Sequence, residues 1–158
     1  MPLLLHRIDD RLIHGQVVVG WGRPLALEFI VLVDDEVATN AWEQELYRMA
    51  VPAGIEVIFS GVRAAADRLA DWDADPRAGA VLTGDIETMA ALYHADKAAV
   101  SAINLGGIHH RPGRTERLPY LYLTDDELGR LRALEREGLR VSAQDVPTAA
   151  PVSLGAIR

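Results

Sequence analysis

Two carboxylates, a guanidinium and an imidazole stand close together near the start of the chain, at Asp9, Asp10, Arg11 and His14. A neutral imidazole is a nucleophile that can carry a phosphoryl group as a labile covalent intermediate. Arg11 has the forked donor geometry that offsets charge on such a group. Asp9 or Asp10 could orient the ring of His14 or hold Arg11, and the sequence leaves open which of them does either. These residue types predict a phosphoryl-transfer site with His14 as its nucleophile.

The backbone around His14 can also contribute to such a site. The motif follows the apolar run Leu3–Ile8, which predicts a buried strand, and precedes an expected helix. The first N–H groups of a helix lack partners inside it, and the helix dipole favours an anion there. We therefore expect phosphate donors among the backbone N–H groups of Ile13, Gly15 and Gln16. The structural alternative is a histidine that only starts a helix, with acids that make turns and caps.

Composition limits the classes of function. The chain has 158 residues, 49% hydrophobic and 25% charged, so we expect one folded domain over residues 1–158. A net charge of −7 without a strong basic stripe argues against a nucleic-acid partner. The apolar opening Met1–Leu5 gives way to His6 and Arg7, so we expect neither a secretory leader nor a membrane span, and a cytoplasmic location. Cysteine is absent, which removes disulfides and thiolate chemistry.

Apolar runs alternate with helical patterns along the chain. The predicted buried strands are Leu3–Ile8, Phe29–Val33, Ile55–Phe59, Ala80–Thr83 and Ala102–Leu105, with Arg140–Val146 as the last strand. Helices are expected after the caps Asn40, Asp85 and Thr124 and from Val62, and Gly138 should end the last helix in a left-handed conformation. Asp71–Ala78 and His110–Pro119 are expected to be surface loops. The order predicts an α/β fold: a single-domain, doubly wound, mostly parallel open sheet of about six to seven strands with helices on both faces.

Four further residues follow predicted strands and could line the rim of the same crevice: Asp34, Ser60, Gly106 and Gly107. For Asp34 we favour a helix-cap role, and for the glycine pair a tight turn. His109 and His110 are adjacent, so in an extended chain they point to opposite faces and cannot readily chelate one ion. We expect no metal site and no cofactor. His6 and His94 receive no function from the sequence.

The motif residues also carry a family resemblance. The stretch Arg7–Val17, RIDDRLIHGQV, resembles the phosphorylation loop of IIB subunits in the mannose-fructose-sorbose family of the bacterial phosphoenolpyruvate-dependent sugar phosphotransferase system. The resemblance continues through Val31–Ala38, Met49–Gly54, Asn104–His109 and Val146–Thr148 in the family's order, and so covers nearly the whole chain.

This resemblance implies a cytoplasmic phosphocarrier enzyme subunit. Such a subunit accepts phosphate from a phosphohistidine on a IIA partner onto His14, with Nδ1 as the receiving nitrogen. It passes the phosphate to a sugar that enters through membrane subunits IIC and IID, which it meets by protein contacts. A signalling receiver is disfavoured, because the positions where it would need an aspartate and a lysine are Ser60 and Gly106. A non-catalytic regulatory or binding module on the same fold stays as the alternative, and the sequence leaves open the sugar and whether the chain forms a homo-oligomer.

Overall fold

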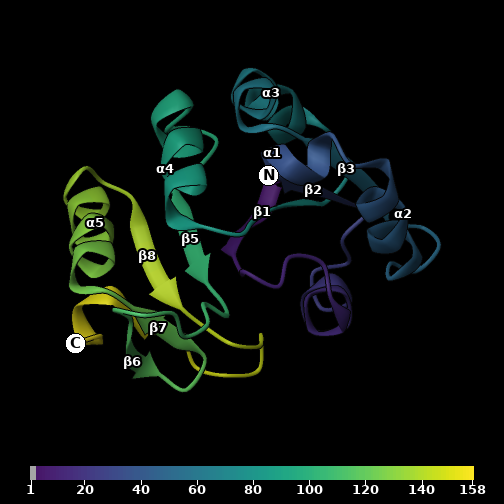
Figure 1. Ribbon diagram of the computed structural model, residues 1–158. Helices are drawn as coiled ribbons and strands as arrows, with labels where there is room; N and C mark the ends of the chain where they lie inside the picture. Colours follow the sequence, from purple (N-terminus) through teal and green to yellow (C-terminus); the bar gives the residue numbers. More distant parts are fainter. Residues whose placement is uncertain (1–2) are drawn as a thin grey trace.

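The fold is built on one twisted sheet. A computed structural model describes residues 3–158, and at Gln16 it describes the backbone alone. Its main sheet has seven strands in the order β3-β2-β4-β1-β5-β8-β9 (Figure 1). The strands are β1 (Leu3–Ile8), β2 (Phe29–Val33), β3 (Glu56–Ser60), β4 (Gly79–Thr83), β5 (Ala102–Leu105), β8 (Arg140–Ala143) and β9 (Val152–Ser153). Neighbouring strands run parallel except β9, which pairs antiparallel with β8. The predicted mostly parallel α/β fold is confirmed.

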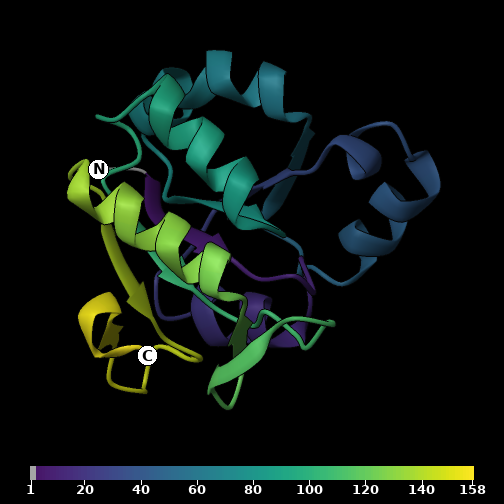
Figure 2. The same ribbon diagram turned by 60° about the vertical axis from the view of Figure 1, so that its left-hand side comes forward.

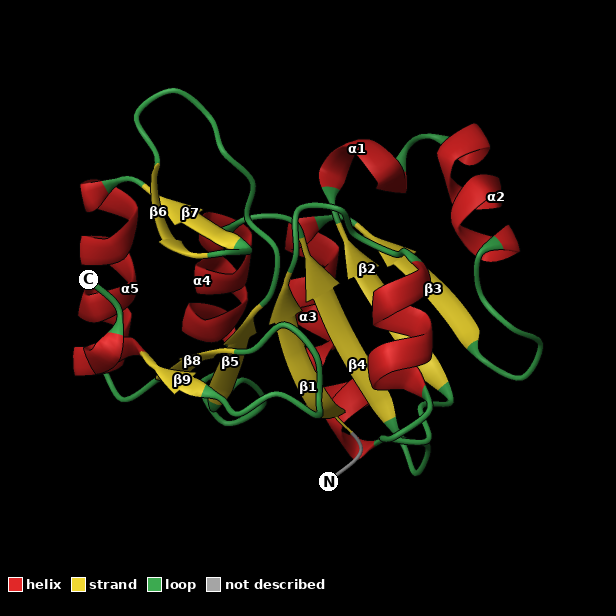
Figure 3. Cartoon of the chain, turned by 90° about the horizontal axis from the view of Figure 1, so that it is seen from below, coloured by secondary structure: helices red, strands yellow, loops and turns green. Residues whose placement is uncertain are grey.

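Helices cover both faces of this sheet, which explains the nearly continuous apolar sequences of β2 and β4. The helical elements are η1 (Gln16–Gly22), α1 (Asp35–Ala38), α2 (Ala41–Met49), α3 (Val62–Ala74), α4 (Ile86–Ala95), α5 (Asp125–Arg136) and η2 (Leu154–Ala156). On one face α3, α4 and α5 bury Leu69, Met89 and Leu131 in a large core, and Figure 2 shows α4 and α5 side by side. On the other face a helix, η1, lies over the sheet (Figure 3). Its Val17 and Trp21 belong to a second core together with residues of β2 and β4.

The expected helix starts are confirmed by their hydrogen bonds. Asn40 accepts from the N–H of Glu43, and Asp85 accepts from the N–H of Thr88. Thr124 and Glu127 form the predicted reciprocal capping box at the start of α5. Gly138, with φ of +114°, provides the left-handed turn after that helix. Local polar side chains therefore set where the covering helices begin.

Several boundaries differ from the sequence prediction. The segment 71–78 is not all loop, because α3 continues to Ala74, and the segment 110–119 contains β6 (Thr115–Leu118), which pairs antiparallel with β7 (Leu121–Leu123). β6 has three polar residues of four and none of its residues is buried, so its sequence lacks the apolar signal of a strand. The last predicted strand stops at Ala143 rather than Val146, since the chain there turns toward β9, and the third strand begins one residue later than Ile55. The helix after His14 is a wide-turn π-helix, η1.

β1 pairs with β4 over more residues than it pairs with β5. Along β4 the strand is paired from Leu3 to Ile8, with one irregularity near Leu4. Among its described residues, Arg7 and Ile8 alone pair with β5. The amino-terminal halves of β1 and β5 therefore separate, while their carboxyl ends meet at the segment that carries His14. Within residues 3–158 no helix has the length and apolar character needed to cross a bilayer.

Candidate active site

The loop from Asp9 to Gly15 leaves the carboxyl end of β1, in the centre of the sheet. The N–H of Asp9 donates to Thr83 O at 2.9 Å, and that of Asp10 donates to Gly107 O at 2.8 Å, so the loop is tied to the strands on both sides. Leu12 has φ of +60°, an uncommon conformation for a branched apolar residue. Such a conformation persists only where the surroundings impose it, and it turns the chain back toward Asp9, whose carbonyl accepts from Leu12 N–H at 2.9 Å.

The two nitrogens of His14 face different surroundings. Nδ1 accepts a hydrogen bond from the N–H of Val17 at 3.2 Å. Nε2 lies 3.5 Å from Asp9 Oδ2, is shielded from solvent and has no hydrogen bond of good geometry within the described chain. In a neutral ring the nitrogen that accepts cannot carry the proton, so this arrangement places the proton on Nε2, facing the carboxylate. The lone pair of His14 is then on Nδ1, at the start of η1.

The charge state of His14 follows from its neighbours. Partial burial lowers its pKa below the ordinary value of 6.5, and the positive charge of Arg11 lowers it further, while Asp9 opposes both. The ring is therefore predominantly neutral at pH 7, which is the form that can act as a nucleophile.

Asp9 is the centre of the polar network behind His14. Its side chain is 0% exposed and accepts from Arg11 Nε and Nη2, each at 3.1 Å, from Gly107 N–H at 3.3 Å and from Arg7 Nη2 at 3.4 Å. Burial alone would raise the pKa of Asp9, but the hydrogen bonds from Arg11 and the charges of Arg11 and Arg7 outweigh it and hold that pKa below 3.8. The carboxylate is thus ionised at neutral pH, and it contacts both Arg11 and the ring of His14.

Arg7 is the functional candidate that sequence reasoning did not single out. Its side chain is 1% exposed, donates to the backbone oxygens of Gln144 at 2.7 Å and Asp145 at 3.0 Å and to Asn104 Oδ1, and lies 4.9 Å from the ring centre of Trp21. Both terminal nitrogens of this guanidinium have acceptors, which offsets much of the cost of its burial, whereas Nε is buried without a hydrogen-bond partner among the described residues. The available signal was a cation inside an otherwise apolar strand.

The glycine pair after β5 makes room for these cations. A Cβ at Gly106 would lie 2.4 Å from Arg7 Nη2, and one at Gly107 would lie 3.2 Å from Arg11 Nη2. Both backbones therefore approach the guanidinium groups more closely than a side chain would allow. The pair supports the network around Asp9 from behind.

The remaining predicted residues lie in different places. Asp10 accepts from the N–H of His109 at 2.7 Å and pairs with its ring, on the side of the loop that faces the segment after β5. Asp34 caps α1 by accepting from Val37 N–H at 3.0 Å, which is the helix-cap role that the sequence favours. Ser60 donates to the carbonyl of Gly61. Asp34 follows β2 and Ser60 ends β3, and β4 separates both of these strands from β1.

The predicted backbone donors belong to the same loop. In the described hydrogen bonds, the N–H groups of Ile13 and Gly15 have no acceptor, and Gln16 begins η1. No cluster of three or more acidic or histidine side chains with metal-binding geometry exists in the described part of the chain. The arrangement thus offers a neutral nucleophile, a cation beside it and open N–H groups.

Comparison with known proteins decides the family. Residues 3–157 match the family described as the PTS system sorbose subfamily IIB component. The chain belongs to this family. The sorbose-specific EIIB component of Klebsiella pneumoniae is 29% identical over 150 residues, which cover 92% of this chain and 90% of the relative. The mannose-specific EIIAB component of Escherichia coli K12 is 24% identical over 94% of this chain, but the match spans only 46% of that longer relative.

Solved structures agree with the sequence match. The crystal structure of manxB from Thermoanaerobacter tengcongensis is similar with a TM-score of 0.85 and 30% identity, covering 98% of this chain and 93% of that one. The family predicted from the motif is therefore confirmed, and with it a role as a phosphocarrier component of a phosphotransferase system in sugar uptake.

Proposed function

We propose that His14 is the residue that carries the phosphoryl group. Its Nδ1 accepts this group from a phosphohistidine on a IIA partner and passes it to a sugar. The observation that carries the proposal is the pairing of His14 Nε2 with the buried Asp9 carboxylate at 3.5 Å, which leaves the lone pair on Nδ1. The proposal takes the chain as a single IIB domain over residues 1–158, working in the cytoplasm.

In the first step, Nδ1 attacks phosphorus and the P–N bond of the donor phosphohistidine breaks. The donor leaves with the electron pair of that bond. The proton on Nε2 stays on the His14 ring, which gains positive charge as the new N–P bond forms. Asp9 offsets that charge, as a carboxylate does for a catalytic imidazole in acyl transfer. Arg11, held by Asp9, lies beside the ring to offset charge on the phosphoryl oxygens.

The backbone at the start of η1 contributes the remaining donors. When Nδ1 bonds phosphorus, the N–H of Val17 loses its acceptor on the ring and can donate to a phosphoryl oxygen instead. The N–H groups of Ile13, Gly15 and Gln16 lie in the same segment. The positive end of η1 therefore stabilises the phosphorylated form without a metal ion.

In the second step a sugar hydroxyl oxygen attacks phosphorus, and the N–P bond breaks with its electron pair returning to Nδ1. His14 is then again a neutral ring with its proton on Nε2, and the hydroxyl proton leaves to solvent. The name of the Escherichia coli relative, an EIIAB component, supports a IIA protein as the donor, since it joins both units in one chain. We place IIC and IID membrane subunits at the acceptor end, as partners met by protein contacts. Asp10, Gly106 and Gly107 hold the loop in this proposal, whereas Asp34 and Ser60 contribute only to the ends of β2 and β3.

The test is phosphate transfer from phosphorylated IIA to the parent protein and to His14→Ala, followed by mass spectrometry of the intact chain and of its peptides. The parent should gain one phosphoryl group, on His14, that is labile in acid and stable in alkali. His110→Ala is the matched control, because it removes an exposed histidine outside the network.

The two results that would refute the proposal are distinct. A phosphoryl group found on another side chain would move the nucleophile. No added mass on the parent, with a donor that phosphorylates another IIB component, would favour the non-catalytic module instead.

A further inference from the structure

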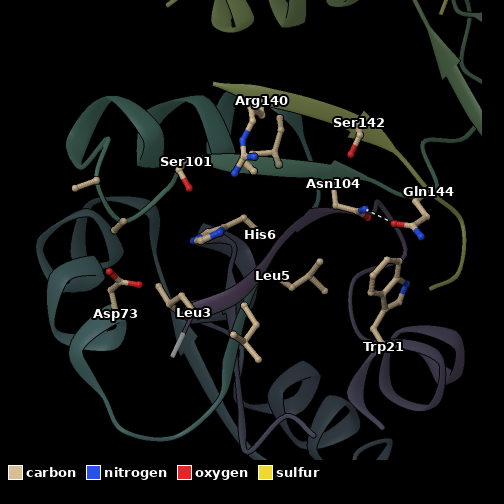
Figure 4. Close-up of a pocket in the computed structure, with 15 residues that line it drawn as sticks. Leu3, Leu5, His6, Trp21, Asp73, Ser101, Asn104, Arg140, Ser142 and Gln144 are labelled. Carbon is tan, nitrogen blue, oxygen red and sulfur yellow. Dashed lines mark hydrogen bonds between the residues drawn. The ribbon is translucent and has the colours of Figure 1, made fainter. Parts of the chain in front are cut away.

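A groove runs along the sheet where β1 and β5 separate, on the amino-terminal side of their last shared pairs (Figure 4). Its volume is about 370 Å³, within the range of roughly 300–1,000 Å³ that small-molecule sites occupy. Leu3, Leu5 and Ile103 provide an apolar floor. The groove is therefore a feature of strand separation and lies apart from the loop that carries His14.

A buried imidazole without a partner faces this groove. His6 is 7% exposed, lies on β1, and its Nε2 has no hydrogen-bond partner within the described residues. Figure 4 shows its ring directed into the groove, beneath Arg140 and Ser101. Burial lowers the pKa of His6 to about 4, so the ring is neutral at pH 7 and can both donate and accept. Leaving a buried polar atom unpaired costs free energy, and a bound polar molecule would remove that cost.

The rim of the groove supplies charge of both signs. Arg140 from β8 and Ser101 before β5 lie on one side, and Asp73 from α3 lies on the other. None of these three side chains has a hydrogen bond or ion pair among those described for residues 3–158. A forked cation beside a hydroxyl fits an anionic oxygen group, whereas a carboxylate and a neutral imidazole fit hydroxyl or amine donors. The ligand that satisfies all of them carries an anionic group and a body rich in hydroxyls.

We propose that this groove binds a small organic phosphate with a hydroxyl-rich body, of the size of a hexose phosphate, with its phosphate at Arg140 and Ser101 and its hydroxyls at His6 and Asp73. The choice of a sugar phosphate within that chemical class rests on the proposed function, because sugar phosphate is the product of the transfer. The groove itself rests only on the residues that line it.

The far end of the groove touches the residues that hold the catalytic network. Trp21, Asn104 and Gln144 line it, and the same three residues contact Arg7 through its ring stacking, its side-chain acceptor and its backbone acceptor. Arg7 in turn donates to Asp9 at 3.4 Å. A ligand in the groove is therefore linked through Arg7 and its contacts to the Asp9 carboxylate, which faces His14.

The experiment is a titration of the full, unphosphorylated chain with mannose 6-phosphate and with galactosamine 6-phosphate, followed by the amide signals of Ser101 and Ser142 and the ring signals of His6. Unphosphorylated mannose and inorganic phosphate are the comparison probes. At least one sugar phosphate should produce saturable shifts of these signals. Arg140→Ala should weaken binding about tenfold or more, as expected for loss of a charge-assisted contact. Arg136→Ala, an exposed arginine on α5 outside the groove, should not.

Four outcomes would overturn the proposal. The first is the absence of a saturable shift at about 10 mM ligand, which is ten times the weakest dissociation constant, about 1 mM, that we would accept as specific. The second is a set of shifts confined to residues 9–17. The third is equal affinity for inorganic phosphate, which would mean adventitious anion binding, and the fourth is equal affinity for mannose. His14→Ala should retain the binding. Because no donor protein is present, failure here leaves the phosphorylation of His14 untouched, and failure of that phosphorylation leaves this titration valid.

Discussion

Replacing Asp9 by asparagine tests the polar network behind His14, because it changes one carboxylate oxygen of that network to an amide NH2 group. The substitution keeps size and shape but puts a neutral amide where Arg11 and Arg7 now donate to a fully buried carboxylate. One retained oxygen can accept some of the present hydrogen bonds, whereas the new NH2 group faces other donors. Removing one partner of a buried ion pair costs about 3–5 kcal/mol, and because one oxygen is retained we expect a loss of about 3 kcal/mol at pH 7.

The pH dependence of that loss has a fixed sign. The pKa of Asp9 in the folded chain lies below its ordinary value of 3.8, so the carboxylate contributes stability fully above that value. As the pH falls from 3.8 through the lower folded pKa, the parent protein binds a proton at Asp9 and loses this contribution. The variant has no proton to bind there. The difference in free energy of unfolding between the two should be constant from pH 7 to pH 5 and should shrink toward pH 3.

Urea unfolding of both chains at pH 7, 5 and 3 measures this difference. Asp34→Asn is the matched control, because Asp34 only caps α1 and asparagine caps a helix equally well. It should change the free energy of unfolding by less than about 0.5 kcal/mol. A loss below about 1 kcal/mol for Asp9→Asn at pH 7, or the same difference at pH 3 as at pH 7, would refute the buried ion network as we describe it.

Three other predictions concern the same site. Gly106→Ala should destabilise the chain by about 1–3 kcal/mol in thermal or urea unfolding, since its Cβ would lie 2.4 Å from Arg7 Nη2, whereas Gly129→Ala on α5, with open space around it, should stabilise it by roughly 0.5–1 kcal/mol. In Arg11→Ala the ring of His14 should titrate at a higher pH than in the parent by NMR, because one of the two causes that lower its pKa, the charge of Arg11, is removed while burial stays. An unchanged midpoint would contradict the contribution of Arg11. Transfer from phosphorylated IIA should keep its rate in excess chelator, because the described residues contain no metal-binding cluster, and a slower rate would point to a required ion.

The strands and capped helices were predictable because their signals are local. The apolar runs at β1, β2 and β4 and the polar caps Asn40 and Thr124 each act within a few residues of where they stand. The hairpin of β6 and β7 was missed because its strands are short and three of the four residues of β6 are polar. No period in the sequence marks a strand that pairs only with its immediate neighbour.

The site was predictable in its residue types but less so in its connections. Asp9 and Asp10 are adjacent and chemically identical, and their different contacts depend on Gly107 and His109, about a hundred residues further along the chain. Arg7 stands in an apolar strand where burial of a cation is rare, and its acceptors come from the segment after β8. Such long-range contacts leave no local pattern, so only the folded chain shows which carboxylate lies beside the ring of His14.

The double tether of the loop has a consequence for how partners must meet this protein. Asp9 donates to the last residue of β4, and Asp10 donates to Gly107 in the segment that follows β5, so the start of the loop cannot swing outward without breaking these hydrogen bonds. In the function we propose, the partner proteins must therefore bring their reactive atoms into line with a loop that is anchored at Asp9 and Asp10. The amide hydrogens of these two residues should accordingly be among the slowest to exchange with deuterium in the whole chain.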